Sequence, residues 1–152
     1  MPLYAEDLHA GMEFPFTSWT LTEEAILDYA RQWDPLPMHI DPVAARSGPH
    51  GGVIASGLHT MAVYQRLIAQ ALWSDVMGIG GRCLQTRFTK PVTPGTTVTG
   101  HAVVEHVTHR PERGTAVIGL AAELIDDIGA VVLKVNVEAV ILRRAGATPV
   151  GP

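Results

Sequence analysis

The sequence predicts an α+β fold in which an antiparallel sheet wraps around one long central helix. Two observations lead to this prediction. In the second half of the chain, apolar residues alternate with polar ones, which is the period of strands with one dry face. In the first half, the segment 56–72 has apolar residues at helical spacing and very little polar surface. Such a helix needs a layer of other elements to bury it, and the sheet supplies that layer.

The strands are predicted from this alternation. The clearest runs over 131–141, where every second residue is apolar and the residues between include Lys134, Asn136 and Glu138. The segment 126–129, Asp-Asp-Ile-Gly, is typical of a hairpin turn leading into it. The other strands are expected over 116–124, 98–104, 84–88 and, at the start of the chain, 11–20.

Short helices and loops are predicted between the first strand and the long helix. A helix over 22–31 has acidic residues in its first turn and either Thr20 or Thr22 as its cap. The prolines of the segment 33–38, WDPLPM, forbid continuation of that helix, so this segment is expected to be a loop. Asp41 followed by Pro42 predicts a further brief helical turn.

Composition limits the class of protein. A chain of 152 residues with 47% hydrophobic residues is expected to fold as one domain, here residues 1–144, followed by a disordered tail over 145–152. The net charge of -4 and the lack of a basic run argue against a nucleic-acid partner. No apolar stretch is long enough to cross a bilayer, and the N-terminus does not resemble a signal peptide. A single cysteine, Cys83, excludes an internal disulfide, and a cytoplasmic location is expected.

The segment WDPLPMHID, residues 33–41, carries the chemistry. It places Asp34 and His39 five positions apart in mostly apolar surroundings and leads to Gly57 at the start of the long helix. The first N–H groups of a helix have no partner inside the helix and carry partial positive charge. A carbonyl oxygen bound at the Gly57 N–H would be polarised, with Asp34 and His39 beside it to move a proton. The pattern indicates general acid–base catalysis next to a carbonyl.

Structural roles compete with this interpretation. Asp34 precedes Pro35 and could simply end a helix or a turn. His39 could be a hydrogen-bonded, half-buried histidine. Asp41 is better explained as a helix cap than as a catalytic acid.

Ser56 and His59 have structural explanations as well. Ser56 is expected to cap the long helix, because GVIASGLH lacks the G-x-S-x-G pattern of a serine nucleophile. His59 lies within the helix and is expected to line it or to join the core. No metal is expected, because the spacing matches no known metal site for the candidate ligands His39, Asp41, His50 and His59.

Two motifs resemble those of one family. The segment 33–63, WDPLPMHIDPVAARSGPHGGVIASGLHTMAV, resembles the signature of the MaoC-like dehydratases, which include the (R)-specific enoyl-CoA hydratases. The segment 87–98, RFTKPVTPGTTV, resembles the second hallmark of that family. Together the matches extend from about residue 20 to about residue 140.

The resemblance implies a hot-dog fold, in which the antiparallel sheet wraps around the long central helix. It implies a homodimer, or a higher assembly of dimers, whose sheets join edge to edge with acyl sites at the interface. The implied reaction is reversible hydration of a trans-2-enoyl thioester to the (R)-3-hydroxyacyl thioester. Asp34 and His39 would be the acid–base pair and the Gly57 N–H the oxyanion donor. No cofactor is implied apart from the CoA or acyl carrier that holds the substrate.

Three positions depart from the family pattern, and other residues are candidates for binding the substrate. Leu36 stands where many members have an Asn that supports the loop, and Ser56 replaces the His of the best-known members. Thr96 stands where Asp is usual. Candidates to contact the phosphates of CoA are Arg82, Arg87 and Lys90. The acyl pocket is expected to involve Trp33, Leu36, Met38, Ser56, Met61 and Tyr64.

Two other functions remain open. Hot-dog thioesterases use a carboxylate on or near the central helix, and the segment 61–65 supplies none. A non-catalytic acyl-CoA-binding subunit is favoured by Leu36 and opposed by the retained Asp34 and His39.

Overall fold

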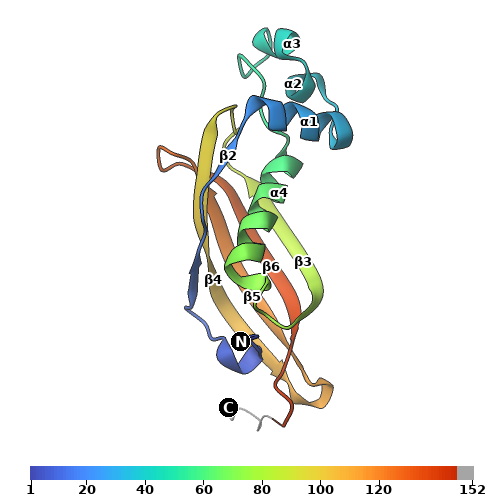
Figure 1. The fold of residues 1–152 in the computed structure, drawn as a ribbon, viewed down its shortest axis with the longest axis vertical. Helices are drawn as coiled ribbons and strands as arrows, with labels where there is room; N and C mark the ends of the chain where they lie inside the picture. The colour runs from blue at the N-terminus through green and yellow to red at the C-terminus, as the bar shows by residue number, and fades with distance from the viewer. Residues whose placement is uncertain (147–152) are drawn as a thin grey trace.

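The computed structural model describes residues 1–146, and Figure 1 shows how its elements are arranged. Three helices stand together at one end of a curved sheet, and a longer helix runs along the concave side of that sheet. In chain order the elements are the turn η1 (Ala5–Asp7), strands β1 (Glu13–Pro15) and β2 (Trp19–Leu21), helices α1 (Glu23–Trp33), α2 (Pro37–Ile40), α3 (Pro42–Arg46) and α4 (Gly57–Ile68), the π-helical turn η2 (Ala69–Trp73), strands β3 (Gly78–Phe88) and β4 (Thr96–Arg110), the turn η3 (Pro111–Arg113), and strands β5 (Thr115–Ile125) and β6 (Val131–Leu142).

The predicted antiparallel sheet is confirmed. Its strand order is β1-β4-β5-β6-β3, and β2 pairs with β4 as well. Strands β5 and β6 are joined by the predicted turn, in which the Asp126 N–H donates to the Ala130 carbonyl at 2.9 Å and Gly129 takes a φ of 84°. The expected strand over 11–20 is divided into β1 and β2, and the first part ends at Pro15, which has no N–H to donate.

Helix α4 packs into the concave face, but only part of its surface is covered. Val63, Tyr64 and Leu67 are buried with the inward residues of β4, β5 and β6 in one core. Leu58 and Ala62 are exposed, so the expectation of a helix buried all round is wrong for the single chain. The reason is the edge strand β3, whose eleven residues are all exposed and which does not close over this side of the helix.

The connecting helices follow the predicted caps with one correction. Thr22 caps α1 through a 3.2 Å bond from the Ala25 N–H, and Asp41 caps α3 by accepting from two N–H groups at 3.0 Å. The segment 33–38 is not entirely a loop, because Pro37 begins the one-turn helix α2. A proline is tolerated at the first position of a helix, where its missing N–H would have no partner.

The end of the described chain is fixed by ion pairs. Arg143 contacts Glu6 at 2.9 Å and Arg144 contacts Asp7 at 2.6 Å. Of the predicted tail, residues 147–152 lie outside the described residues. Within residues 1–146, no helix is long and apolar enough to cross a membrane.

Candidate active site

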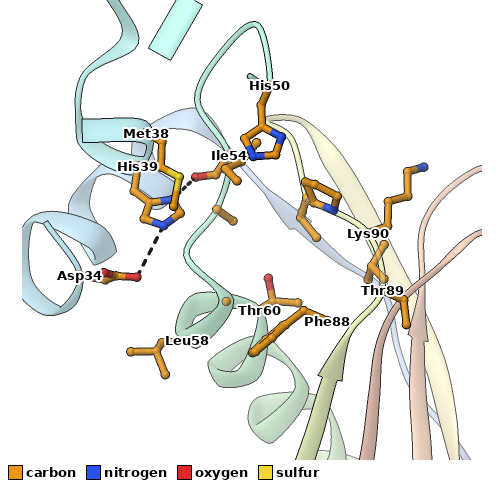
Figure 2. Close-up of a pocket in the computed structure, with 15 residues that line it drawn as sticks. Asp34, Met38, His39, His50, Ile54, Leu58, Thr60, Phe88, Thr89 and Lys90 are labelled. Atoms are coloured by element: carbon orange, nitrogen blue, oxygen red, sulfur yellow. Dashed lines mark hydrogen bonds and ion pairs between the residues drawn. The ribbon is translucent and has the colours of Figure 1, made fainter. Parts of the chain in front are cut away.

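The Asp34–His39 segment is folded by its two prolines. Asp34 ends α1, donating its N–H to the Ala30 carbonyl at 2.9 Å, and Pro35 prevents another turn. The chain then turns sharply, with the Leu36 N–H donating to the Asp34 carbonyl at 2.8 Å. Pro37 starts α2, and this single turn directs His39 back toward Asp34 (Figure 2). The sequence thus brings the two side chains face to face without a long connecting loop.

The hydrogen bonds of His39 determine which ring nitrogen carries the proton. The ring is buried, and its Nδ1 lies 2.8 Å from the Ile54 carbonyl oxygen. A carbonyl can only accept, so Nδ1 carries the hydrogen and donates it. In the neutral ring Nε2 is therefore a bare acceptor, and it lies 3.5 Å from Oδ2 of Asp34. The Ile54 backbone is itself held by its N–H, which donates to the Met38 carbonyl at 3.2 Å.

Ser56 connects this pair to the long helix. Its hydroxyl donates to Oδ2 of Asp34 at 2.6 Å and accepts from the Leu58 N–H at 3.2 Å. The second bond makes Ser56 the cap of α4, as predicted. The side chain is fully buried and does not line the pocket, so its contact with substrate stays a prediction.

Gly57 is the first residue of α4. Among the described residues no acceptor receives its N–H, which is expected at the first position of a helix. The Phe88 ring lies directly against its Cα, because a Cβ added to Gly57 would be 2.9 Å from two ring carbons. The start of the helix therefore has an N–H group without an acceptor, which carries partial positive charge and lies near the Phe88 ring.

One pocket contains Asp34, His39 and Gly57 together. Its volume is about 470 Å³, and Figure 2 shows Asp34 and His39 on one side and Phe88 and Thr89 on the other. The pocket is open to solvent and has both polar and apolar lining residues, as a site for a thioester with an acyl chain requires. The apolar side chains on its walls belong to Met38, Ile54, Leu58, Phe88, Val92 and Val132.

Of the side chains predicted for the acyl pocket, only Met38 lines it. Tyr64 is buried in the core with its ring edge against Phe16, 6.2 Å between centroids, and Met61 packs against the same core. Leu36 and Trp33 are 47% and 68% exposed and do not line the pocket. Helical spacing identifies an apolar face but does not separate a core contact from a pocket contact.

Leu58, Thr60 and Phe88 line the pocket and were not among the predicted site residues. Their positions in the sequence could have indicated this, because Leu58 and Thr60 follow Gly57 in the first turn of the helix. Phe88 ends the predicted strand that leads into the second family motif.

Lys90, a candidate for binding phosphate, lines the pocket but is already paired. Its ammonium group donates to Asp126 at 2.5 Å. This bond, together with N–H donors from Ala130 and Ile128, holds the pKa of Asp126 below its usual value against the opposing effect of burial. The positive charge of Lys90 is therefore largely neutralised by Asp126.

His59 is a buried residue of α4 that does not line the pocket. Its ring stacks on Tyr29 of α1, with centroids 4.6 Å apart and planes 8° from parallel. Burial lowers the pKa of His59, so the ring is held neutral. In the part of the chain that the structure describes, no group of three or more His, Cys, Asp or Glu side chains is placed to hold a metal ion.

Comparison with known proteins identifies the family. The profile of the MaoC-like domain matches residues 8–123. The chain belongs to the MaoC-like domain family. A MaoC-like dehydratase from Rhodospirillum rubrum has a structure similar to this MaoC-like protein, with 29% identity, a TM-score of 0.83, and 93% of this chain and 98% of that chain covered.

Two further proteins resemble this MaoC-like chain. The uncharacterized protein YdeM of Bacillus subtilis is 29% identical over 109 residues, which are 71% of this chain and 76% of YdeM. The R-hydratase PhaJ1 of Pseudomonas aeruginosa shares the fold, with a TM-score of 0.76, 19% identity, and 99% of this chain and 95% of that chain covered. The hot-dog fold and the membership of a dehydratase family that the sequence predicted are thus confirmed.

Proposed function

We propose that this MaoC-like protein is a hydro-lyase that reversibly hydrates trans-2-enoyl thioesters to (R)-3-hydroxyacyl thioesters. One observation carries the proposal: the Asp34 carboxylate, the bare Nε2 of His39 and the unclaimed N–H of Gly57 all border the same pocket. These are the three groups that addition of water to a conjugated thioester needs: two to handle protons and one to stabilise oxygen charge.

The spacing of the pair suits a bound water. Oδ2 of Asp34 and Nε2 of His39 are 3.5 Å apart, which is too long for a strong direct hydrogen bond. A water molecule can contact both atoms at once, donating one hydrogen to each. Because Nδ1 of His39 already carries a hydrogen, Nε2 is the nitrogen free to accept a proton.

The reaction then proceeds in two proton transfers. The thioester oxygen accepts the Gly57 N–H, which draws electron density from the C2–C3 double bond. The water oxygen bonds to C3 as Nε2 takes one of its protons, and the electron pair of the double bond moves onto the thioester as an enolate. The partial positive charge at the start of α4 stabilises the enolate oxygen. The protonated pair returns a proton to C2, which completes the addition and restores the pair.

Two other functions are less well supported. Hot-dog thioesterases use a carboxylate on or near the central helix. Helix α4 contains no Asp or Glu, and Asp34, which lies near its start, is paired with His39 and Ser56. A non-catalytic subunit was suggested by Leu36, but the turn does not need an Asn side chain there. The Leu36 carbonyl accepts the N–H groups of His39 and Ile40 at 2.8 and 3.2 Å and holds the loop through the backbone.

The test is an assay with crotonyl-CoA and longer trans-2-enoyl-CoA substrates. Hydration is followed by loss of the enoyl absorbance, and the configuration of the product is read by chiral chromatography. We expect loss of absorbance with an (R)-3-hydroxyacyl product. Release of free thiol would instead support a thioesterase, and binding without either change would support a non-catalytic subunit.

We further propose that the protein is a homodimer joined through β3. This strand ends the sheet, all its residues are exposed, and Ile79, Leu84 and Phe88 are apolar. An exposed apolar edge strand is a template for pairing with another chain. Light scattering after size-exclusion chromatography should give the mass of two chains. Leu84→Lys should reduce the mass to one chain, whereas Ile128→Lys, a control with the same charge change in an exposed turn, should not.

A further inference from the structure

The hydroxyl of Ser56 makes two bonds that join separate parts of the site. It donates to Oδ2 of Asp34 at 2.6 Å and accepts from the Leu58 N–H at 3.2 Å. The Ser56 side chain is fully buried, whereas the Asp34 carboxylate that accepts its hydrogen is 26% exposed. A buried hydroxyl that donates to a carboxylate forms a strong, charge-assisted hydrogen bond.

This geometry excludes Ser56 as a nucleophile. A serine nucleophile gives its proton to an imidazole and exposes its oxygen to the substrate. Here the proton goes to a carboxylate, the oxygen already accepts a backbone N–H, and no surface of the side chain reaches the pocket.

The bond to Oδ2 fixes the orientation of the Asp34 carboxylate. Oδ2 is the oxygen that also faces Nε2 of His39, so a single atom is held by Ser56 and presented to the imidazole. Among residues 1–146, Oδ1 of Asp34 has no hydrogen-bond partner. Without Ser56 the carboxyl group could rotate about its own axis and exchange the two oxygens.

The bond from the Leu58 N–H to Ser56 links the Asp34 carboxylate to the start of α4, where the proposed oxyanion donor lies. The cap positions the first turn of α4, and Gly57, next to Ser56, supplies the N–H proposed to bind the thioester oxygen. One hydroxyl thus sets the distance between the proton-transferring carboxylate and the carbonyl-binding amide, although the two lie on different helices. A misplacement of about 1 Å in such a site costs roughly a hundredfold in rate.

We infer that Ser56 is a positioning residue for the proposed hydration, which orients the Asp34 carboxylate toward His39 and holds it in register with the Gly57 N–H. The inference rests on the proposed function for its effect on rate. The hydrogen bond itself can be tested without any activity.

The variants separate the cap from the bond to Asp34. Ser56→Gly keeps most of the capping, because glycine is tolerated at this position, but it removes the hydroxyl. Ser56→Ala loses both, and Ser56→Thr retains a hydroxyl that can make both bonds. Removing a hydrogen bond to a charged group predicts a fall in kcat of about 10- to 100-fold for Gly and Ala, with KM changed less than about twofold and recovery in Thr.

The division of the effect between kcat and KM distinguishes positioning from a contact with substrate. A residue that only orients the carboxylate should lower kcat and leave KM nearly unchanged, and Ser56→Thr should restore kcat. A wild-type kcat in Ser56→Gly would overturn the inference.

A cycle of thermal unfolding midpoints tests the bond independently of activity. Ser56→Gly should lower the midpoint by a few degrees in the wild type and by clearly less in an Asp34→Ala background, where the acceptor is already gone. Equal decreases in both backgrounds would show that the hydroxyl acts only on the helix and would overturn the inference. If the wild type hydrates no enoyl-CoA, the proposed function fails, and the cycle alone decides whether Ser56 holds Asp34.

Discussion

Gly57→Ala is the most direct test of the oxyanion site. A Cβ at this position would lie 2.9 Å from Cε1 and Cζ of Phe88 and 3.3 Å from Cδ1. Non-bonded carbon atoms pack about 3.5–4.0 Å apart, so the Phe88 ring must move away by roughly 0.6–1.1 Å. In the single chain Phe88 is 54% exposed, so its ring has room to move, and the effect on the stability of the fold should stay within about 1 kcal/mol.

The effect on catalysis should be much larger. The new methyl group stands beside the N–H that is proposed to bind the thioester oxygen, and it displaces a wall of the pocket. The N–H itself remains in the variant, so the loss comes from displacement of the thioester oxygen. A misplacement of about 1 Å costs roughly a hundredfold, and we expect kcat/KM to fall by about that factor. Steady-state hydration of crotonyl-CoA measures this, and thermal unfolding should show a midpoint within about 3 °C of wild type.

Two further variants make the result interpretable. Gly52→Ala is the matched control, because a Cβ at Gly52 would have nothing within 4 Å and its φ is not positive. It should hydrate like the wild type. The double variant Gly57→Ala/Phe88→Ala removes the crowded ring and should stay slow, because the methyl group remains. Wild-type kcat/KM in Gly57→Ala would refute the assignment of its N–H to the thioester oxygen.

The other predictions concern the acid–base pair and two buried titratable groups. Asp34→Asn and His39→Ala should each lower kcat by about 10²- to 10⁴-fold with an unchanged circular dichroism spectrum, and wild-type turnover in either would reject the mechanism. Burial lowers the pKa of His59 in the folded chain, so the wild type should lose stability as the pH falls below about 6.5. His59→Phe keeps the stack on Tyr29 and should reduce that loss in urea unfolding at about pH 5 relative to about pH 8, and an unchanged loss would contradict this account. The lowered pKa of Asp126 means that its stabilisation is present above about pH 4 and is lost as the pH falls further. Asp126→Ala should lower the free energy of urea unfolding at neutral pH and lower it less at acid pH, and a loss that stays the same at acid pH would contradict the argument.

The sequence predicted the main strands of the sheet because their signal is local. Alternation along 116–124 and 131–141 indicated β5 and β6, since every second residue from 116 to 124 and most such residues from 131 to 141 are buried. In β5 Val117 and Gly119 are buried as well, which alternation does not predict. The caps Thr22, Asp41 and Ser56 were also readable, because each acts on an N–H two or three residues away.

The errors come from features that local patterns do not specify. Pro37 either prevents or starts a helix, depending on where the preceding turn ends. Tyr64 and Met61 lie on an apolar helix face, but only the arrangement of Phe16 and the sheet shows that they meet the core. The bond between Ser56 and Asp34 joins residues 22 positions apart, so it depends on how α1 and α4 cross and not on either segment alone.

The position of Phe88 separates the wall of the pocket from the groups that face it. Phe88 lines the pocket from β3, whereas Asp34, His39 and Ser56 are joined by hydrogen bonds in and beside the helices at the other side. None of those bonds involves β3. A substitution at Phe88 can therefore change the shape of the pocket without removing any bond that orients Asp34 or His39, so that the shape and the polar groups of this pocket can change independently during evolution.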